Sequence, residues 1–193
     1  QQGDLDSFNR LILHYQDMVY NLTYRMLGDG DSADDATQTT FISAYRSLKS
    51  FKGGSFKAWI MRMATNNCLD ELRRLKRHPS TSLEPVRDED DEVFDTPAWL
   101  KDNNAGPENT LEMKELEAGI QDCLNNLPDE FKAVVTLVEI EGLDYSEASE
   151  IINTPLGTIK SRLARARFKL RDCLRGYMEL LPDEFRLREE KSL

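Results

Sequence analysis

The chain has 193 residues, with 35 acidic and 25 Lys or Arg side chains, and a formal net charge of -10 at pH 7. This length allows one or two small domains. The acidic balance argues against tight binding of free DNA, because the overall field repels phosphate. With no secretory signal sequence and no apolar run of 18 residues, we expect neither export by that route nor membrane insertion, and a cytoplasmic location.

The cysteines and histidines are too scattered to predict a metal site. Cys68, Cys123 and Cys173 stand far apart, no CxxC pattern occurs, and His14 and His78 are remote from each other. In a reducing compartment we expect all three cysteines to pack in or near helix cores. We also expect no cofactor.

The N-terminal 48 residues predict two amphipathic helices. An apolar stripe at helical spacing runs from Phe8 to Met26, and Gly28 ends it. Ser32, followed three residues later by Asp35, predicts the start of a second helix that continues through Leu48.

A loop at residues 51–55 (FKGGS) precedes a third predicted helix. Its two glycines indicate the loop. A stripe from Ile60 through Ala64, Cys68 and Leu72 to Leu75 predicts a helix from near Phe56 to about Arg77. Four prolines and an acidic run then indicate a linker over residues 79–107.

Helices are expected again from near Glu108 to Tyr177, followed by a charged tail at residues 178–193. Leu127 begins a helical stripe that Gly142 ends, and Asp144 with Glu147 predicts a capping box for a short helix. No strand-like alternation stands out. The fold class predicted is therefore all-α, with two small helical domains at residues 1–78 and 108–177 joined by the acidic linker.

The segment from Thr154 to Arg175 predicts a basic recognition helix. Thr154 is expected to cap the helix and Pro155 to take its first position. An apolar stripe from Ile159 to Cys173 leaves a basic face on the other side. A basic helix that opens with small residues suits the DNA major groove, so this segment and the short helix before it predict a helix-turn-helix.

Three blocks in this order resemble the extracytoplasmic-function sigma factors of bacterial RNA polymerase. Residues 34–46 (DDATQTTFISAYR) resemble region 2.2, and residues 51–67 (FKGGSFKAWIMRMATNN) resemble regions 2.3 and 2.4. Residues 127–174, with PLGTIKSR at 155–162, resemble region 4. The resemblance covers residues 5–78 and 108–177. The chain departs from the family at Thr39, where a glutamate is usual, and at Ala148 and Ser149, which are small.

The resemblance implies a transcription initiation factor without catalytic residues, whose partners are core RNA polymerase, promoter DNA and an anti-sigma factor. On the polymerase it implies contacts with the β′ clamp helices and the β flap. The residues expected to bind polymerase are Asp35, Gln38, Phe41, Ile42 and Tyr45, although at least one of the three apolar ones is expected to be core.

The same resemblance assigns DNA contacts to both halves. The separated strand of the -10 element needs aromatic faces for stacking and amides for reading base edges. One of the aromatic residues expected there, Trp59, is equally well explained as a core residue. The residues expected there are Phe51, Phe56, Trp59, Asn66 and Asn67, with Arg62, Arg73 and Arg74 on phosphates. Those expected at the -35 element are Thr158, Lys160, Ser161, Arg162 and Arg165.

Two other functions remain open on the sequence alone. A stand-alone helix-turn-helix regulator would leave residues 51–77 unexplained and would bind DNA tightly without polymerase. A sigma-mimicking protein that binds an anti-sigma factor usually carries a receiver domain, which this chain lacks. An enzyme is disfavoured, since residues 157–161 (GTIKS) lack the spacing of a phosphate-binding loop.

Overall fold

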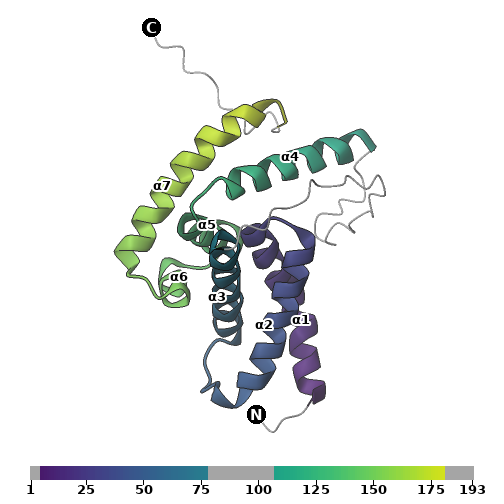
Figure 1. Ribbon diagram of the computed structural model, residues 1–193, viewed down its shortest axis with the longest axis vertical. Coiled ribbons are helices and arrows are strands. Elements are labelled where there is room, and N and C mark those ends of the chain that lie inside the picture. Colours follow the sequence, from purple (N-terminus) through teal and green to yellow (C-terminus); the bar gives the residue numbers. More distant parts are fainter. Residues whose placement is uncertain (1–4, 78–106, 181–193) are drawn as a thin grey trace.

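A computed structural model describes residues 5–77 and 107–180, and within them every element is helical. The helices form two bundles that lie against each other (Figure 1). The all-α fold predicted from the sequence is therefore confirmed. The predicted linker lies almost wholly, and the predicted tail largely, outside the described residues.

The N-terminal bundle contains α1 (Leu5–Leu27), α2 (Gly30–Ser47) and α3 (Phe56–Arg77), with a 3-10 turn, η1, after α2. Each helix packs on the other two through its apolar stripe, and the centre of the bundle is fully buried. Leu75, predicted to belong to the stripe of α3, is instead 38% exposed because it lies in the projecting last turn. The side chains at the centre include Val19, Leu22, Met26, Ile60, Met61 and Ala64.

The start of α2 differs from the sequence prediction. Asp29, rather than Ser32, is the N-cap residue, and its carboxylate accepts a hydrogen bond from the Ser32 backbone N–H at 2.8 Å. Gly28 just before it has a positive φ of 88°, which a glycine adopts without strain. The helix therefore begins one turn earlier than the Ser32–Asp35 pattern predicts.

The C-terminal bundle contains the helix-turn-helix. The capping box of Asp144 and Glu147 is confirmed at the start of α6. Asn153 then takes the left-handed conformation, with φ 53°, and turns the chain into α7. The elements are α4 (Pro107–Asn125), α5 (Asp129–Val135), η2 (Thr136–Ile140), α6 (Tyr145–Ile152), α7 (Leu156–Leu174) and η3 (Arg175–Leu180).

Two details of this bundle correct the sequence analysis. Thr154 does not cap α7: its hydroxyl donates to the Ile152 carbonyl at 3.4 Å, and Pro155 occupies the N-cap position without a side-chain hydrogen bond. The helix predicted after Leu127 also changes to a π-helix at Thr136–Ile140. Such a one-turn widening leaves no periodicity signal in a sequence.

A disulfide joins Cys123 of α4 to Cys173 of α7, whereas free cysteines were expected. Only Cys68 is free among the three, and its thiol is fully buried in the N-terminal bundle. Burial raises the pKa of the Cys68 thiol to about 12, so the group stays protonated and unreactive at neutral pH. The two bonded cysteines are 50 positions apart, a spacing from which no pairing could be predicted.

Candidate polymerase and nucleic-acid interfaces

The outer face of α2 presents most of the residues expected to bind polymerase. Asp35 and Gln38 are exposed, and Ile42 and Tyr45 keep 45% and 41% of their surface in solvent. Phe41 is the exception, because it is 7% exposed and packs in the bundle core. The sequence analysis expected at least one of the three apolar residues to be core without saying which, and Phe41 is that residue.

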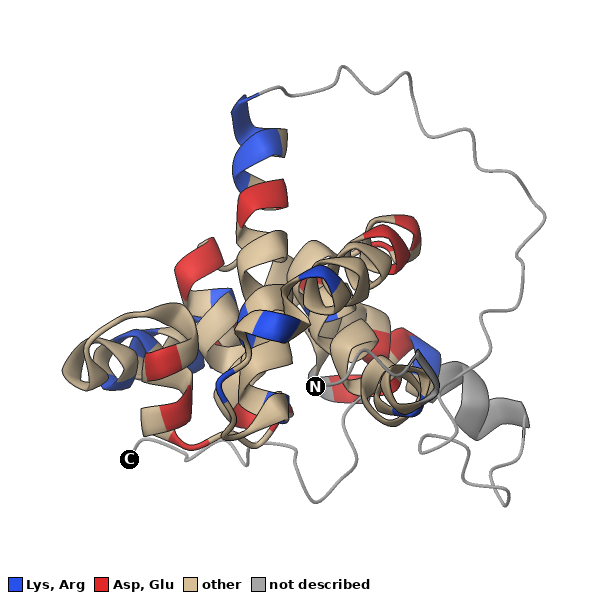
Figure 2. Cartoon of the chain, turned by 90° about the horizontal axis from the view of Figure 1, so that it is seen from below, with Lys and Arg blue, Asp and Glu red and all other residues tan. Residues whose placement is uncertain are grey.

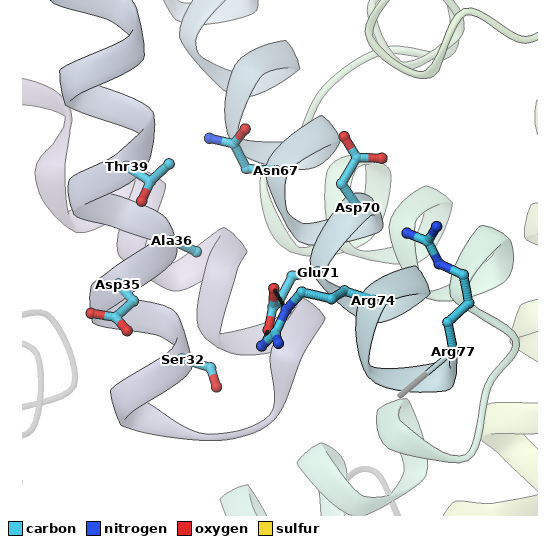
Figure 3. A pocket seen from close by; sticks show the side chains of 9 residues that line it. All are labelled: Ser32, Asp35, Ala36, Thr39, Asn67, Asp70, Glu71, Arg74 and Arg77. Atoms are coloured by element: carbon cyan, nitrogen blue, oxygen red, sulfur yellow. Dashed lines mark hydrogen bonds and ion pairs between the residues drawn. The ribbon is translucent and has the colours of Figure 1, made fainter. Parts of the chain in front are cut away.

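Beside this face, α2 and α3 enclose a groove of about 590 Å³ (Figure 3). Thr39 of α2 lines it, and opposite lie Asp70, Glu71 and Arg74 of α3. Both carboxylate oxygens of Glu71 accept hydrogen bonds from Arg74, at 2.8 and 2.6 Å. These bonds hold the pKa of Glu71 below its usual value. The groove thus contains a carboxylate–guanidinium pair from α3 beside the helix in which Thr39 replaces the family's usual glutamate, which sequence analysis of α2 alone did not reveal.

An aromatic cluster precedes and opens α3. The ring centroids of Phe51, Phe56 and Trp59 lie 5.1 to 5.8 Å from one another, and all three side chains are half-buried. Gly53 and Gly54, both at φ 93°, turn the loop between the first two rings, and open space surrounds both glycines. The loop therefore offers partly exposed aromatic faces that neighbouring side chains do not cover completely.

The two asparagines of α3 play different parts. Asn66 is exposed, whereas Asn67 is half-buried and its amide donates to the Thr40 hydroxyl of α2 at 2.9 Å. Asn67 thereby ties two helices together. Of this pair, only Asn66 presents its side chain to solvent.

The cations expected on phosphates lie along α3, and the last turns of the helix are strongly basic (Figure 2). Arg73 pairs with Asp70 and Arg74 with Glu71 within the same helix. Arg62 instead donates to the backbone carbonyl of Glu150 in α6 at 2.7 Å. None of these surface pairs is strong enough to prevent exchange for a phosphate.

On α7, the residues expected at the -35 element do not all face solvent: Lys160, Ser161 and Arg165 are exposed, whereas Thr158 and Arg162 are half-buried. Arg165 is exposed, and the Ser161 hydroxyl donates to the Thr158 carbonyl at 3.0 Å. The ammonium nitrogen of Lys160 lies over the ring of Tyr145, 5.9 Å from its centroid. Arg162 turns toward the bundle, where it is 21% exposed and paired with Glu130 at 2.6 Å.

Two ionisable groups, the buried Lys132 and the half-buried Glu141, were missed by the sequence analysis. Lys132 is 4% exposed, and desolvation lowers the pKa of its ammonium group. Burial raises the pKa of Glu141 to about 7, against the opposing effects of Lys57 and Arg25. Both residues lie at the contact between the bundles, which no local pattern could have indicated.

The part of the chain that the structure describes offers neither a metal site nor a membrane-spanning helix. In the two described ranges, no group of three His, Cys, Asp or Glu residues could hold a metal ion. Over the same ranges, no helix is both long and apolar enough to span a bilayer.

Comparison with known proteins identifies the class of protein first. The model of sigma-70 region 2 matches residues 11–78, and that of sigma-70 region 4 matches residues 118–170. The chain is thus a sigma factor, which directs RNA polymerase to promoters for transcription initiation. This class consists of initiation factors rather than enzymes.

The relatives narrow the class to one family. The chain is 40% identical over 168 residues to the ECF RNA polymerase sigma-E factor of Haemophilus influenzae. The aligned residues cover 86% of this chain and 87% of the relative. It is 37% identical to the RNA polymerase sigma-H factor of Pseudomonas aeruginosa, with 86% of each chain covered. The chain therefore belongs to the extracytoplasmic-function family of sigma factors.

Solved structures share the fold at lower identity. The sigma factor RpoE of Bartonella quintana, in complex with the anti-sigma factor NepR, has a TM-score of 0.66 and 21% identity, with 89% of this chain and 98% of that chain covered. CnrH in complex with the cytosolic domain of CnrY has a TM-score of 0.61 and 22% identity, with 90% and 91% covered.

Proposed function

We propose that this sigma factor divides promoter recognition among three surfaces of its two domains, residues 1–78 and 108–177, in the cytoplasm. The outer face of α2 docks on core polymerase, the start of α3 captures the separated -10 strand, and the outer face of α7 reads the -35 element. The observation that carries the proposal is the aromatic cluster of Phe51, Phe56 and Trp59 at the start of the helix that presents Asn66.

Capture of the -10 strand follows from the chemistry of this cluster. An unstacked base gains stacking energy on an aromatic face, about 1–3 kcal/mol per base. The exposed amide of Asn66 can donate to and accept from a base edge. These contacts exist only once the strands are apart, so they favour the open complex over the closed one.

Recognition of the -35 element rests on the outer face of α7. Lys160 and Ser161 lie in the first half of the helix, the part that a helix-turn-helix places in the major groove, and Arg165 is at its middle. Arg or Lys bonded to guanine is the commonest specific contact there. Arg162 pairs with Glu130 instead and serves the fold or a nearby phosphate.

Docking on polymerase uses the exposed Asp35, Gln38, Ile42 and Tyr45 of α2, with the β′ clamp helices as the counterpart. Glu71 and Asp70 line the groove beside this face, where they pair with Arg74 and Arg73 respectively. The β flap is the expected contact of the C-terminal bundle. An anti-sigma factor is a further partner, because the sigma factors of known structure that share this fold were solved with one bound.

The decisive test compares Asn66→Ala with Asn9→Ala, an exposed asparagine on α1, in transcription with core polymerase. Asn66→Ala should form closed complexes at normal levels and fail to open them, as permanganate reactivity of unpaired thymines reports. A pre-melted bubble template should restore most of the activity, since the unpairing cost of a few kcal/mol is already met. Normal opening of duplex promoters by Asn66→Ala would contradict the assignment.

A further inference from the structure

Tyr145 is the first residue of α6, the helix that packs beside α7 (Figure 1). The capping box holds its backbone on both sides. The carboxylate of Asp144 accepts hydrogen bonds from the backbone N–H groups of Ser146 and Glu147, at 2.7 and 2.8 Å. The Glu147 carboxylate accepts one in return from the Asp144 N–H at 3.0 Å. The side chain of Tyr145 is half-buried, so the first turn of α6 holds an aromatic ring in a defined place next to α7.

Two cations of α7 lie against this aromatic side chain. The ammonium nitrogen of Lys160 is 5.9 Å from the ring centroid, within the range of a cation–π contact. Arg167 follows seven residues later, so it lies two turns further along the same face of α7. Glu139 of η2 accepts two hydrogen bonds from its guanidinium, at 3.1 and 2.5 Å. These bonds raise the pKa of Arg167, and the Tyr145 phenol contributes a smaller part of the effect.

The contact with the ring leaves the ammonium group of Lys160 able to donate to a base. An aromatic face attracts a cation through its quadrupole, so the N–H groups that point away from the ring stay available. Lys160 is exposed, and these donors can reach a ligand from solvent. Immobilising a flexible lysine on a base costs conformational entropy. Because the ring already restricts the lysine rotamers, less of this entropy is lost when DNA binds.

We propose that Tyr145 is a positioning residue for promoter recognition: its ring orients the ammonium group of Lys160 toward a base of the -35 element. Arg167, bonded to Glu139, holds the phenol end of the same side chain. This role of Tyr145 rests on the proposed function of Lys160 as a reader of that element. The effect of the ring is confined to the base that Lys160 reads, and the base read by Arg165 is recognised without it.

A double-mutant cycle separates positioning from simple packing. Tyr145→Leu removes the ring but keeps an apolar side chain, whereas Tyr145→Phe keeps the ring. Each is made alone and together with Lys160→Ala. Tyr177→Leu is the matched control, because Tyr177 is also a half-buried tyrosine of the C-terminal bundle but lies against Gly119 of α4.

The experiment uses holoenzyme assembled from the full-length chain and core polymerase. Promoter fragments with each base of the -35 element changed in turn compete for it, which gives a preference at every position. We expect Lys160→Ala to lose the preference at one base pair. Tyr145→Leu should weaken that same preference roughly two- to fivefold, as expected for loss of an exposed cation–π contact.

The other variants should show that the effect passes through Lys160. Tyr145→Phe should retain the preference, because the ring remains in place. In the Lys160→Ala background, Tyr145→Leu should cause no further change. Tyr177→Leu should keep the wild-type pattern at every position, and the preference that Arg165→Ala removes should persist in Tyr145→Leu.

Fluorinated phenylalanines at position 145 provide a version of the test that preserves the packing. Ring fluorines withdraw electron density from the aromatic face, so they weaken its attraction for a cation with little change in shape. Starting from Tyr145→Phe, the preference at the base read by Lys160 should fall as fluorines are added. This series decides the question if circular dichroism shows that Tyr145→Leu has lost its helices.

Three outcomes would overturn the role of Tyr145. A loss spread evenly over the element would indicate a phosphate contact or a damaged fold. An equal effect of Tyr145→Leu with and without the Lys160 side chain would mean that the two residues act independently. An unchanged preference across the fluorinated series would exclude the ring. Failure of the proposed function looks different, because Lys160→Ala would then alter no base preference, whatever Tyr145→Leu does.

Discussion

The ammonium nitrogen of Lys132 lies 3.1 Å from the carbonyl oxygen of Met26, although the two residues are 106 positions apart in the sequence. Lys132 belongs to α5, and Met26 lies in the last turn of α1 in the other bundle. The carbonyls at the end of a helix lack partners within the helix and carry partial negative charge. A buried lysine of the C-terminal bundle therefore caps a helix of the N-terminal one.

Lys132→Met should weaken the fold where the bundles meet. The ammonium group also donates to the Asn125 side chain at 3.2 Å, so the substitution leaves two acceptors without this donor. Hydrogen bonds to a charged group contribute about 1.5–3 kcal/mol each, partly offset by the removal of a buried charge. We expect a net loss on the order of 1–3 kcal/mol in urea unfolding. Lys49→Met, at an exposed position, should change little.

Reduction of the Cys123–Cys173 disulfide should destabilise the C-terminal bundle. The bond closes a chain segment of 50 positions that includes the whole helix-turn-helix. Loop-closure entropy then predicts a contribution of about 4 kcal/mol. Thermal unfolding with and without dithiothreitol should show this loss in the wild type. The variant with Cys123→Ser and Cys173→Ser should already be less stable and should not respond to the reductant. An equal response of wild type and variant would mean that the bond contributes nothing.

The helices were predictable where one face is buried by local neighbours. The stripe from Phe8 to Met26, and the capping box at Asp144, each carry their own signal within a few turns of sequence. Asp29 was missed because Ser32 offers an equally good cap pattern three residues later. Leu75 fits the stripe of α3, but in the last turn of that helix its side chain stays 38% exposed.

The contacts that relate the bundles could not be predicted in this way. Arg25 of α1 donates a hydrogen bond to Glu117 of α4 at 3.0 Å, although the two residues are 92 positions apart. Each of them has several equally plausible local partners in the sequence. The same holds for the disulfide between Cys123 and Cys173 and for the hydrogen bond from Lys132 to the carbonyl of Met26. The candidate functional surfaces were easier to propose from the sequence, since Asn66 and Arg165 lie within contiguous motifs. That Asn67 is bonded within the fold while Asn66 is exposed could be seen only from the position of Thr40 in the structure.

Stability should fall as the pH rises through about 7 because of Glu141. Burial raises the pKa of this carboxyl from 4.5 to about 7, and the cations that face it are Lys57 and Arg25. The folded chain thus holds the proton more tightly than the unfolded one. The stabilising contribution is complete below pH 4.5 and is lost between there and about pH 7. Urea unfolding of the wild type and Glu141→Gln at pH 5.5 and 8 tests this. The variant should lose less stability than the wild type across that interval, and an identical loss would exclude Glu141 as the cause.

Arg165→Ala and Lys160→Ala should lower initiation at promoters that need a -35 element. Each lost base contact weakens recognition by about 1–3 kcal/mol, which corresponds to roughly fivefold to 150-fold at limiting polymerase. The Arg165 side chain is exposed, so its removal should leave the fold unaffected. Assembly with core polymerase should also be normal, because these residues lie on α7 rather than on the docking face of α2.

Arg162→Ala provides the contrast on the same helix, one residue from Ser161. Its guanidinium is committed to Glu130, so its loss should reduce stability more than sequence discrimination. The measurement is run-off transcription from promoters with each base of the -35 element changed in turn. Arg165→Ala and Lys160→Ala should each become insensitive to particular base changes, while Arg162→Ala should keep the wild-type pattern. If Arg162→Ala instead relaxes specificity and Arg165→Ala does not, α7 enters the groove rotated by about a sixth of a turn from the orientation proposed, since three residues of helix correspond to about 300°, which is about 60° short of a full turn.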